Sequence, residues 1–228
     1  MPAHPSNRAL VANRPLLGFV LHDIEGPAAS AISWFGQDHG ARGPSSAHLV
    51  FGAHGMVSLV VPIDEVAFHT IGGLWEPDWM HGIAPQGNWS VVNECTIGLE
   101  MEGYSPGPYP DVMLAKVAEF ILDLSRAYGI PLGLDRLLYH SELQGDRKDP
   151  EPRGRTTVKR RVWEVMQRIM ELEVEVANLN GVVKDALRQK DFANGLKREM
   201  EHAARQRGLT QAEIDAFIVK VSKEVGVS

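Results

Sequence analysis

The sequence predicts an α/β domain over residues 1–157, followed by an all-α tail over residues 158–228 that forms a coiled coil or another helical arrangement. The charge changes at this boundary, because the first part has a net charge of −8 and the tail one of +2. Eight of the nine histidines also lie in the first part. The patterning differs as well, since short apolar runs separated by Gly and Pro give way to a proline-free stretch with helical spacing.

The first part alternates strand-length apolar runs with segments of helical spacing. The run at 16–21 has the length of a buried strand. Residues 48–51 and 56–61 flank Gly-Ala-His-Gly and are expected to pair as a hairpin. Residues 96–102 alternate like a strand, and a short strand at 137–139 leads into His140. The remaining expected elements are a helix at 28–35, a long surface loop at 71–93, and a helix at 111–128 that Asp111 can cap and Gly129 can end.

In the tail, apolar residues recur at alternating spacings of three and four, the heptad pattern of a coiled coil. One seam position is β-branched and the other mainly Leu, which favours a parallel two-stranded coil. We therefore expect a homodimer through residues 160–187, with a helix packed on its own domain, or in a small helical hairpin, as the alternatives. Gly208 and a capping box from Thr210 to Glu213 predict a break and a final short helix. The seam residues are Val162, Val165, Ile169, Leu172, Val176, Leu179, Val183 and Ala186.

Composition excludes several classes of protein. The single cysteine, Cys95, excludes an internal disulfide and a four-cysteine zinc site. A net charge of −6 argues against non-specific nucleic-acid binding. No run approaches the roughly 18 apolar residues that a membrane helix needs. The N-terminal residues lack the pattern of a secretory signal, so we expect no signal peptide.

Two histidines and one aspartate stand where a metal site could form. His22 and His140 each end an expected strand, and Asp149 follows His140 by nine residues across a charged loop. A catalytic zinc site uses three protein ligands and leaves one position for water. By spacing alone other triplets are equally available, because the chain has nine histidines.

Five segments in order resemble the zinc N-acetylmuramoyl-L-alanine amidases of the amidase-2 family, which includes phage endolysins, wall-recycling amidases and peptidoglycan recognition proteins. The resemblance covers roughly residues 15–155 and none of the helical tail. It implies a central mixed β-sheet flanked by helices. The segments are V-L-H-D-I-E-G, S-S-A-H-L-V-F-G-A-H-G, A-F-H-T, N-E-C-T-I-G-L-E-M-E-G and Y-H-S-E-L-Q-G-D-R-K-D-P.

The resemblance also implies roles for individual residues. His22, His140 and Asp149 match the Zn²⁺ ligands, and Glu100 matches the catalytic glutamate that takes a proton from water. Glu102 points to the same face as Glu100 if the strand alternates regularly, so it is the competing candidate.

Other positions match the family less closely. His48 and His69 match motifs that line the substrate groove in relatives. Arg147 stands where the family has Lys or Thr facing the oxyanion, so either Arg147 or Lys148 takes that role. Ala47 replaces a tyrosine that some relatives use.

The resemblance therefore predicts a hydrolase of bacterial peptidoglycan, cutting the amide between N-acetylmuramic acid and L-alanine. With its helical tail, the chain is expected to be a phage endolysin, held in the host cytoplasm until holin-dependent release. The alternatives are a non-catalytic peptidoglycan-binding module and a wall-recycling amidase. No nucleic-acid or membrane partner is expected.

Overall fold

The computed structural model describes residues 1–70, 79, 89–105, 107–144, 146–151, 157–206, 208 and 210–225. The chain forms two compact units, Met1–Ile169 and Met170–Ser228. The limit between them lies inside a helix that begins at Thr157, so the first unit also contains the first turns of the tail. None of the described helices is both long and apolar enough to span a membrane.

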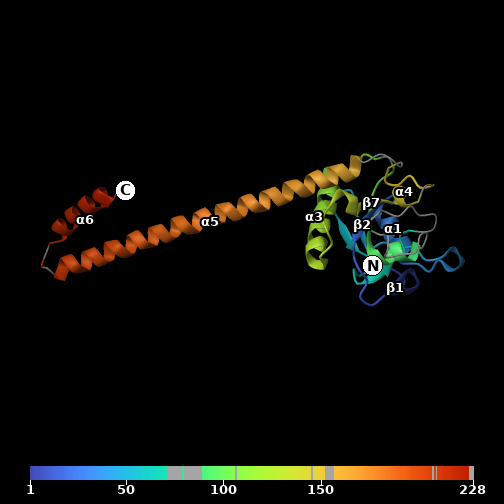
Figure 1. Ribbon diagram of the computed structural model, residues 1–228, viewed down its shortest axis with the longest axis horizontal. Coiled ribbons are helices and arrows are strands. Elements are labelled where there is room, and N and C mark those ends of the chain that lie inside the picture. Colours follow the sequence, from blue (N-terminus) through green and yellow to red (C-terminus); the bar gives the residue numbers. More distant parts are fainter. Residues whose placement is uncertain are drawn as a thin grey trace. The chain divides into compact units, whose positions relative to one another are not determined.

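The centre of the first unit is a mixed five-stranded sheet with the strand order β4-β3-β6-β2-β7 (Figure 1). Four strands run parallel, and β4 is an antiparallel edge strand paired with β3. This confirms the expected mixed sheet and hairpin. The strands are β2 (Gly18–Asp23), β3 (Leu49–Phe51), β4 (Val57–Leu59), β6 (Thr96–Met101) and β7 (Leu137–Tyr139). A further antiparallel pair, β1 (Arg8–Leu10) with β5 (Glu65–Ala67), was not predicted.

Four helices accompany the sheet among the described residues before Thr157. The helices α1 (Ala28–Phe35) and α3 (Asp111–Tyr128) have the predicted bounds, and Gly129 ends α3 in the left-handed conformation. The prediction of a surface loop over residues 71–93 is wrong at its end, where α2 (Trp89–Cys95) forms and runs directly into β6. Apart from position 79, residues 71–88 lie outside the described part. The fourth helix is α4 (His140–Leu143), and short 3-10 helices occur at Pro5–Asn7, Gly40–Arg42 and Leu134–Arg136.

The two faces of the sheet are covered by different helices. Side chains of successive strand residues point to opposite faces. Val50 of β3 packs in a cluster with α1, whereas the next residue, Phe51, meets Phe120 of α3 with ring centroids 5.8 Å apart. Val20 and Leu138 pack with buried residues of α2 and α4. Thus α3 closes one face of the sheet with apolar contacts, whereas α1, α2 and α4 cover the other face.

The tail begins as part of the first unit. A single helix, α5, spans Thr157–Gln206. Val158, Val162 and Met166 follow one another at four-residue spacing and are all buried, whereas the next turns are exposed. The first turns of α5 therefore bury an apolar stripe within the unit Met1–Ile169, and the predicted seam residue Val162 is used there.

Hydrogen bonds fix this start of α5 to residues beside His140. The buried Lys159 ammonium donates to both carboxylate oxygens of Glu142, at 2.8 and 2.7 Å, and its backbone N–H donates to the Tyr139 hydroxyl at 2.6 Å. The Thr157 N–H donates to the Glu151 carboxylate at 3.0 Å. Orphan N–H groups of the first helical turn are thereby satisfied.

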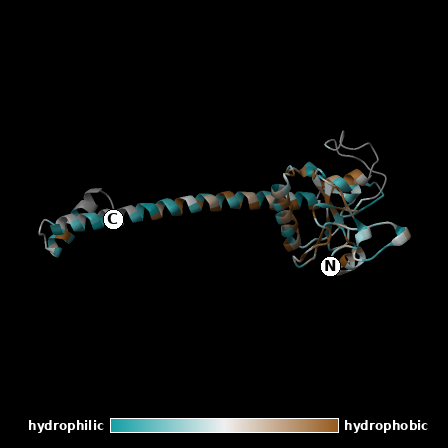
Figure 2. Ribbon diagram, turned by 90° about the horizontal axis from the view of Figure 1, so that it is seen from below, coloured by the Kyte–Doolittle hydropathy of each residue, from teal (hydrophilic) through white to brown (hydrophobic). Residues whose placement is uncertain are grey.

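Beyond this start, α5 shows hydrophilic and hydrophobic residues in alternation (Figure 2). In the second unit, α6 (Gln211–Val225) follows the predicted break and lies beside the end of α5 in both views. The capping box is confirmed, since the N–H of Thr210 donates to Glu213 at 2.8 Å and the Glu213 N–H reaches the Thr210 hydroxyl at 3.5 Å. Ile214 of α6 is buried.

We expect Met166→Ala to lower the free energy of unfolding by about 2–5 kcal/mol, because it leaves a cavity under the first turns of α5. Val174→Ala on the same helix is the control: Val174 is 62% exposed, and its loss should cost less than about 0.5 kcal/mol. Urea unfolding of the full chain, followed by near-UV circular dichroism, measures both. Equal effects of the two variants would contradict the packing of α5 described above.

Candidate metal and catalytic site

The parallel register of the sheet places the candidate residues together. His22 of β2 lies opposite Glu100 of β6, and both stand near the carboxyl ends of their strands. On the other side of β2, strand β7 ends at Tyr139, so His140 begins α4 at the same edge. Crevices outside the carboxyl ends of parallel strands are the usual ligand sites of such sheets.

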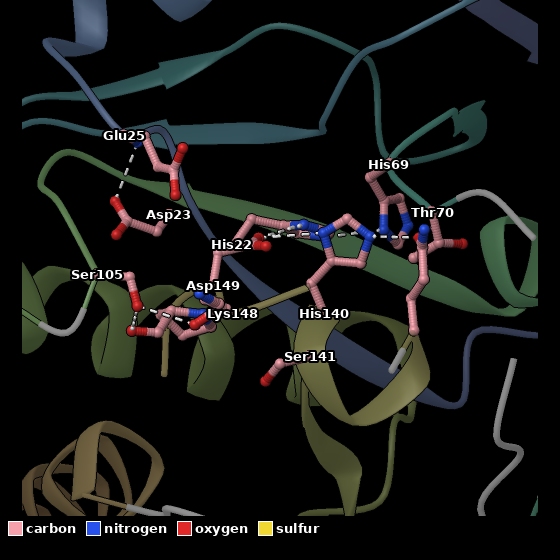
Figure 3. Close-up of polar contacts among 12 residues, drawn as sticks. His22, Asp23, Glu25, His69, Thr70, Ser105, His140, Ser141, Lys148 and Asp149 are labelled. Atoms are coloured by element: carbon pink, nitrogen blue, oxygen red, sulfur yellow. Dashed lines mark hydrogen bonds and ion pairs between the residues drawn. The ribbon is translucent and has the colours of Figure 1, made fainter. Parts of the chain in front are cut away.

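His22, His140 and Asp149 meet at one point (Figure 3). The Oδ2 atom of Asp149 lies 3.0 Å from Nδ1 of His140 and 3.7 Å from Nδ1 of His22. One potential ligand atom from each residue lies within 4.8 Å of the other two, and all three residues are buried. The structure thus brings together the three residues expected as zinc ligands.

Outer hydrogen bonds determine which nitrogen of His140 faces Asp149. The amide oxygen of Gln144 lies 3.1 Å from Nε2 of His140. An amide oxygen only accepts, so Nε2 carries a hydrogen and donates it. In the neutral ring, Nδ1 is then an unprotonated nitrogen directed at Asp149.

His22 is oriented in the same sense by a longer series of hydrogen bonds. Its Nε2 lies 3.1 Å from Nδ1 of His69, whose own Nε2 lies 3.3 Å from the hydroxyl of Thr96. That hydroxyl donates to the Val92 carbonyl at 2.6 Å, so it accepts from His69. Each neutral imidazole has one donor and one acceptor nitrogen. These hydrogen bonds therefore leave Nδ1 of His22 unprotonated and facing Asp149.

Two lone pairs of nitrogen and one carboxylate oxygen consequently converge without a hydrogen between them. Such a group of acceptors needs a positive charge at its centre, either a proton or a metal ion. Burial lowers the pKa of His22 to about 4, so His22 is neutral at pH 7. Two neutral imidazoles and a carboxylate are a donor set that zinc accepts, with a fourth position left for water. The residues therefore fit the zinc ion that the family resemblance implies.

The Asp149 carboxylate stays ionised in this setting. Burial would raise its pKa, but a proton on His140 or His22, which is the positive charge that this cluster needs without a metal, is donated to Asp149 and holds the pKa of Asp149 well below its usual range. Its loop is fixed from two sides: the Ser141 N–H donates to the Asp149 carbonyl at 3.1 Å, and the Ser105 hydroxyl lies 2.8 Å from the carbonyls of Lys148 and Pro150.

Glu100 has the environment of a tuned acid–base group. Burial, followed by the charges of Asp149 and Asp23, raises the pKa of Glu100 to about 8, and the charge of Arg147 opposes this rise. The carboxylate of Glu102 is occupied elsewhere: it follows the end of β6 and accepts the Ala53 N–H at 2.7 Å. The structure thus separates the two glutamates that strand alternation left equivalent.

A cavity of about 690 Å³ opens above these residues. Its lining includes His22, His140, Asp149 and Glu100, together with both candidates for the oxyanion role, Arg147 and Lys148. Arg42 adds a further positive charge to the lining, and Trp34 and Phe68 add aromatic surface.

The two histidines expected to line the substrate groove differ in position. His69 lines the cavity, although both of its ring nitrogens already have protein partners. His48 is fully buried in the core, where its Nδ1 accepts the Gly98 N–H at 3.0 Å and its Nε2 lies 3.1 Å from the Glu65 carbonyl. Trp79 is half-buried and donates to the Asp135 carbonyl at 3.0 Å.

Sequence reasoning missed Gln144 and Thr96. A signal existed for Gln144, which follows His140 by four residues and so lies on the same helical face. Thr96 precedes Glu100 by four strand residues and shares its face, but nothing in the sequence relates it to His69.

Comparisons with known proteins give a family and a fold. A family model for N-acetylmuramoyl-L-alanine amidase matches residues 12–152. A solved structure of a selenomethionine derivative of AmpD is similar with a TM-score of 0.53 and 20% identity, covering 71% of this chain and 92% of that chain. The N-acetylmuramoyl-L-alanine amidase LysC from Clostridium intestinale URNW is similar with a TM-score of 0.46 and 15% identity, covering 68% and 85%. Curated protein sequences give no match.

The raised pKa of Glu100 predicts a pH dependence of stability in chelator-treated protein. Native Glu100 keeps its proton up to about pH 8, whereas in the unfolded chain it loses it near 4.5. Between these values the native state binds more protons, so this residue lowers the free energy of unfolding as pH rises. In Glu100→Gln the side chain at this position cannot titrate. The melting temperature of the variant, relative to that of the wild type, should therefore rise between pH 4.5 and 8. A constant difference in thermal melts across this range would disprove the shift.

Proposed function

The chain belongs to the N-acetylmuramoyl-L-alanine amidase family, and from this premise we propose that it is a zinc hydrolase of bacterial peptidoglycan. Its bond would be the amide between N-acetylmuramic acid and L-alanine of the stem peptide. The observation that carries the zinc assignment is the convergence of Nδ1 of His22, Nδ1 of His140 and Oδ2 of Asp149, with both rings oriented by outer hydrogen bonds.

In this proposal His22, His140 and Asp149 hold the zinc ion. A bound zinc ion supplies the Lewis acidity that makes water a nucleophile at neutral pH. The charge of a bound zinc ion would lower the pKa of Glu100 and keep it ionised, so that it accepts the proton of the attacking water and gives it to the nitrogen of L-alanine as the amide bond breaks. Glu100 lines the same cavity as the three ligands, which supports this role.

Arg147 is the better candidate for the group that stabilises the oxyanion. Its charge acts on both Glu100 and His22, whereas the backbone carbonyl of Lys148 takes part in anchoring the loop of Asp149. Arginine stays charged throughout the reaction, so it would stabilise the oxyanion electrostatically and transfer no proton.

An exposed apolar strip on the tail supports the proposal that the substrate is polymeric. Beyond the turns of α5 that pack in the first unit, Leu172, Val176, Leu179 and Val183 continue the heptad pattern and are 42–57% exposed. We propose that this strip pairs with a second copy of the chain. Two linked catalytic units would gain avidity on a cell wall, which has many cleavage sites. This favours a phage endolysin acting in host lysis over an enzyme of small soluble muropeptides.

Digestion of purified peptidoglycan tests the activity. Zinc-loaded wild type should release stem peptides with a free L-alanine amine, detected by mass spectrometry, and chelator should abolish this. Glu100→Gln should retain zinc and lower kcat by about 100-fold or more. Glu102→Gln, the matched control, should keep most of the activity. Wall that is bound but left uncut by the zinc-loaded wild type would instead identify a recognition module.

Analytical ultracentrifugation tests the dimer. Val176→Asp should shift the full chain from dimer to monomer, because it places a charge in the apolar seam. Val174→Asp is the control, since Val174 is 62% exposed but lies outside the heptad positions. A monomeric wild type, or equal behaviour of the two variants, would exclude pairing through this strip.

A further inference from the structure

We propose that His69 and Thr96 form a positioning pair for His22, which fixes its ring so that Nδ1 is the metal-binding atom. The inference rests on the zinc site of the proposed function. It gives His69 a role different from contact with the substrate, and it gives Thr96 a role that no pattern in the sequence indicates.

The hydrogen-bond chain has only one direction. The Val92 carbonyl can only accept, so it takes the hydrogen of the Thr96 hydroxyl at 2.6 Å. Thr96 then accepts from Nε2 of His69, and Nδ1 of His69 accepts from Nε2 of His22, at 3.3 and 3.1 Å. The carbonyl of α2 thus determines the tautomer of a metal ligand three hydrogen bonds away.

The backbone of His69 is held independently of its ring. The side-chain oxygen of Asn93 accepts the N–H of His69 at 3.2 Å and that of Thr70 at 3.0 Å, and its amide nitrogen donates to the Thr70 carbonyl at 3.0 Å. Both Asn93 and Thr70 are buried. The segment that carries His69 therefore cannot shift without breaking several buried hydrogen bonds, which is costly.

The sheet also leaves space for the ring at one residue. A Cβ atom at Gly98 of β6 would lie 2.6 Å from Cγ and 2.7 Å from Cδ2 of His69. Such contacts are too short for any side chain, so glycine is needed where the ring of His69 lies on the strand. Gly98 stands between Thr96 and Glu100 on the same face of β6.

These contacts leave His69 little capacity to bind substrate. Both ring nitrogens have partners within the protein, and the residue is only 7% exposed. A histidine whose two nitrogens are engaged in this way serves the ligand that it contacts. Outer partners of metal-binding histidines typically contribute about 10- to 100-fold in metal affinity.

Three variants of the full chain test the proposal through zinc affinity, measured by competition with a chelator. Thr96→Val removes the acceptor for His69 and should raise the zinc dissociation constant by about 10- to 100-fold. Thr96→Ser keeps the hydroxyl and should restore the wild-type constant. Thr70→Val is the matched control: it also removes a buried hydroxyl hydrogen bond beside Asn93, but leaves the chain to His22 intact, so its constant should equal that of the wild type.

Nitrogen-15 NMR of the histidines in metal-free protein at pH 7 gives a second readout, which a merely structural role would not move. The wild type should show His22 as the Nε2–H tautomer, and Thr96→Val should populate the Nδ1–H form. A Thr96→Val protein with wild-type zinc affinity and an unchanged His22 tautomer would overturn the inference while leaving the zinc site in place. Failure of the wild type to bind zinc would instead overturn the proposed function.

Discussion

The convergence of three electron-pair donors at His22, His140 and Asp149 is the constraint on which the rest of the site depends. Donors that face one another repel unless a positive charge lies between them, so the fold must hold each one in place. It does so from outside. Gln144 orients one histidine, and the chain through His69 orients the other. Hydrogen bonds from two separate segments fix the loop that carries the aspartate. A site prepared in this way loses little conformational entropy when a ligand binds.

The same constraint explains why one face of the sheet is apolar and the other carries polar residues. The face under α3 is closed by apolar side chains and includes the rings of Phe51 and Phe120. The other face carries the polar residues, because alternation places His22, Glu100 and Thr96 on one side and the parallel register aligns them. Burial in this setting raises the pKa of Glu100 to about 8 and lowers that of His22 to about 4. Opposite pKa shifts of neighbouring groups, caused mainly by burial, are typical of catalytic sites.

Much of the fold, and the three residues that converge at the candidate site, could be predicted from the sequence. The bounds of α1 and α3 follow from helical spacing, and those of α3 also from its terminal signals. The resemblance to a known family selected His22, His140 and Asp149 from nine histidines and many carboxylates, which spacing alone could not do. The roles of Thr96 and His69 could not be predicted, because they arise from the register of β2 with β6 and from a segment distant in sequence. Helix α2 was missed because Gly, Pro and Trp before it are typical of a loop.

The tail shows why a periodic pattern does not by itself identify what covers it. Residues 162–186 repeat as one heptad seam, yet the structure gives the beginning of this pattern a different use. Met166, which is not a seam residue, is fully buried, whereas the seam residue Val165 is only partly buried. Polar contacts explain the difference: Lys159 is bound to Glu142 and Tyr139, which fixes the rotation of the first turns of α5. These two residues flank His140, so contacts that orient the helix also stabilise the segment carrying His140. The start of the tail is therefore a structural part of the unit Met1–Ile169, which carries the candidate site.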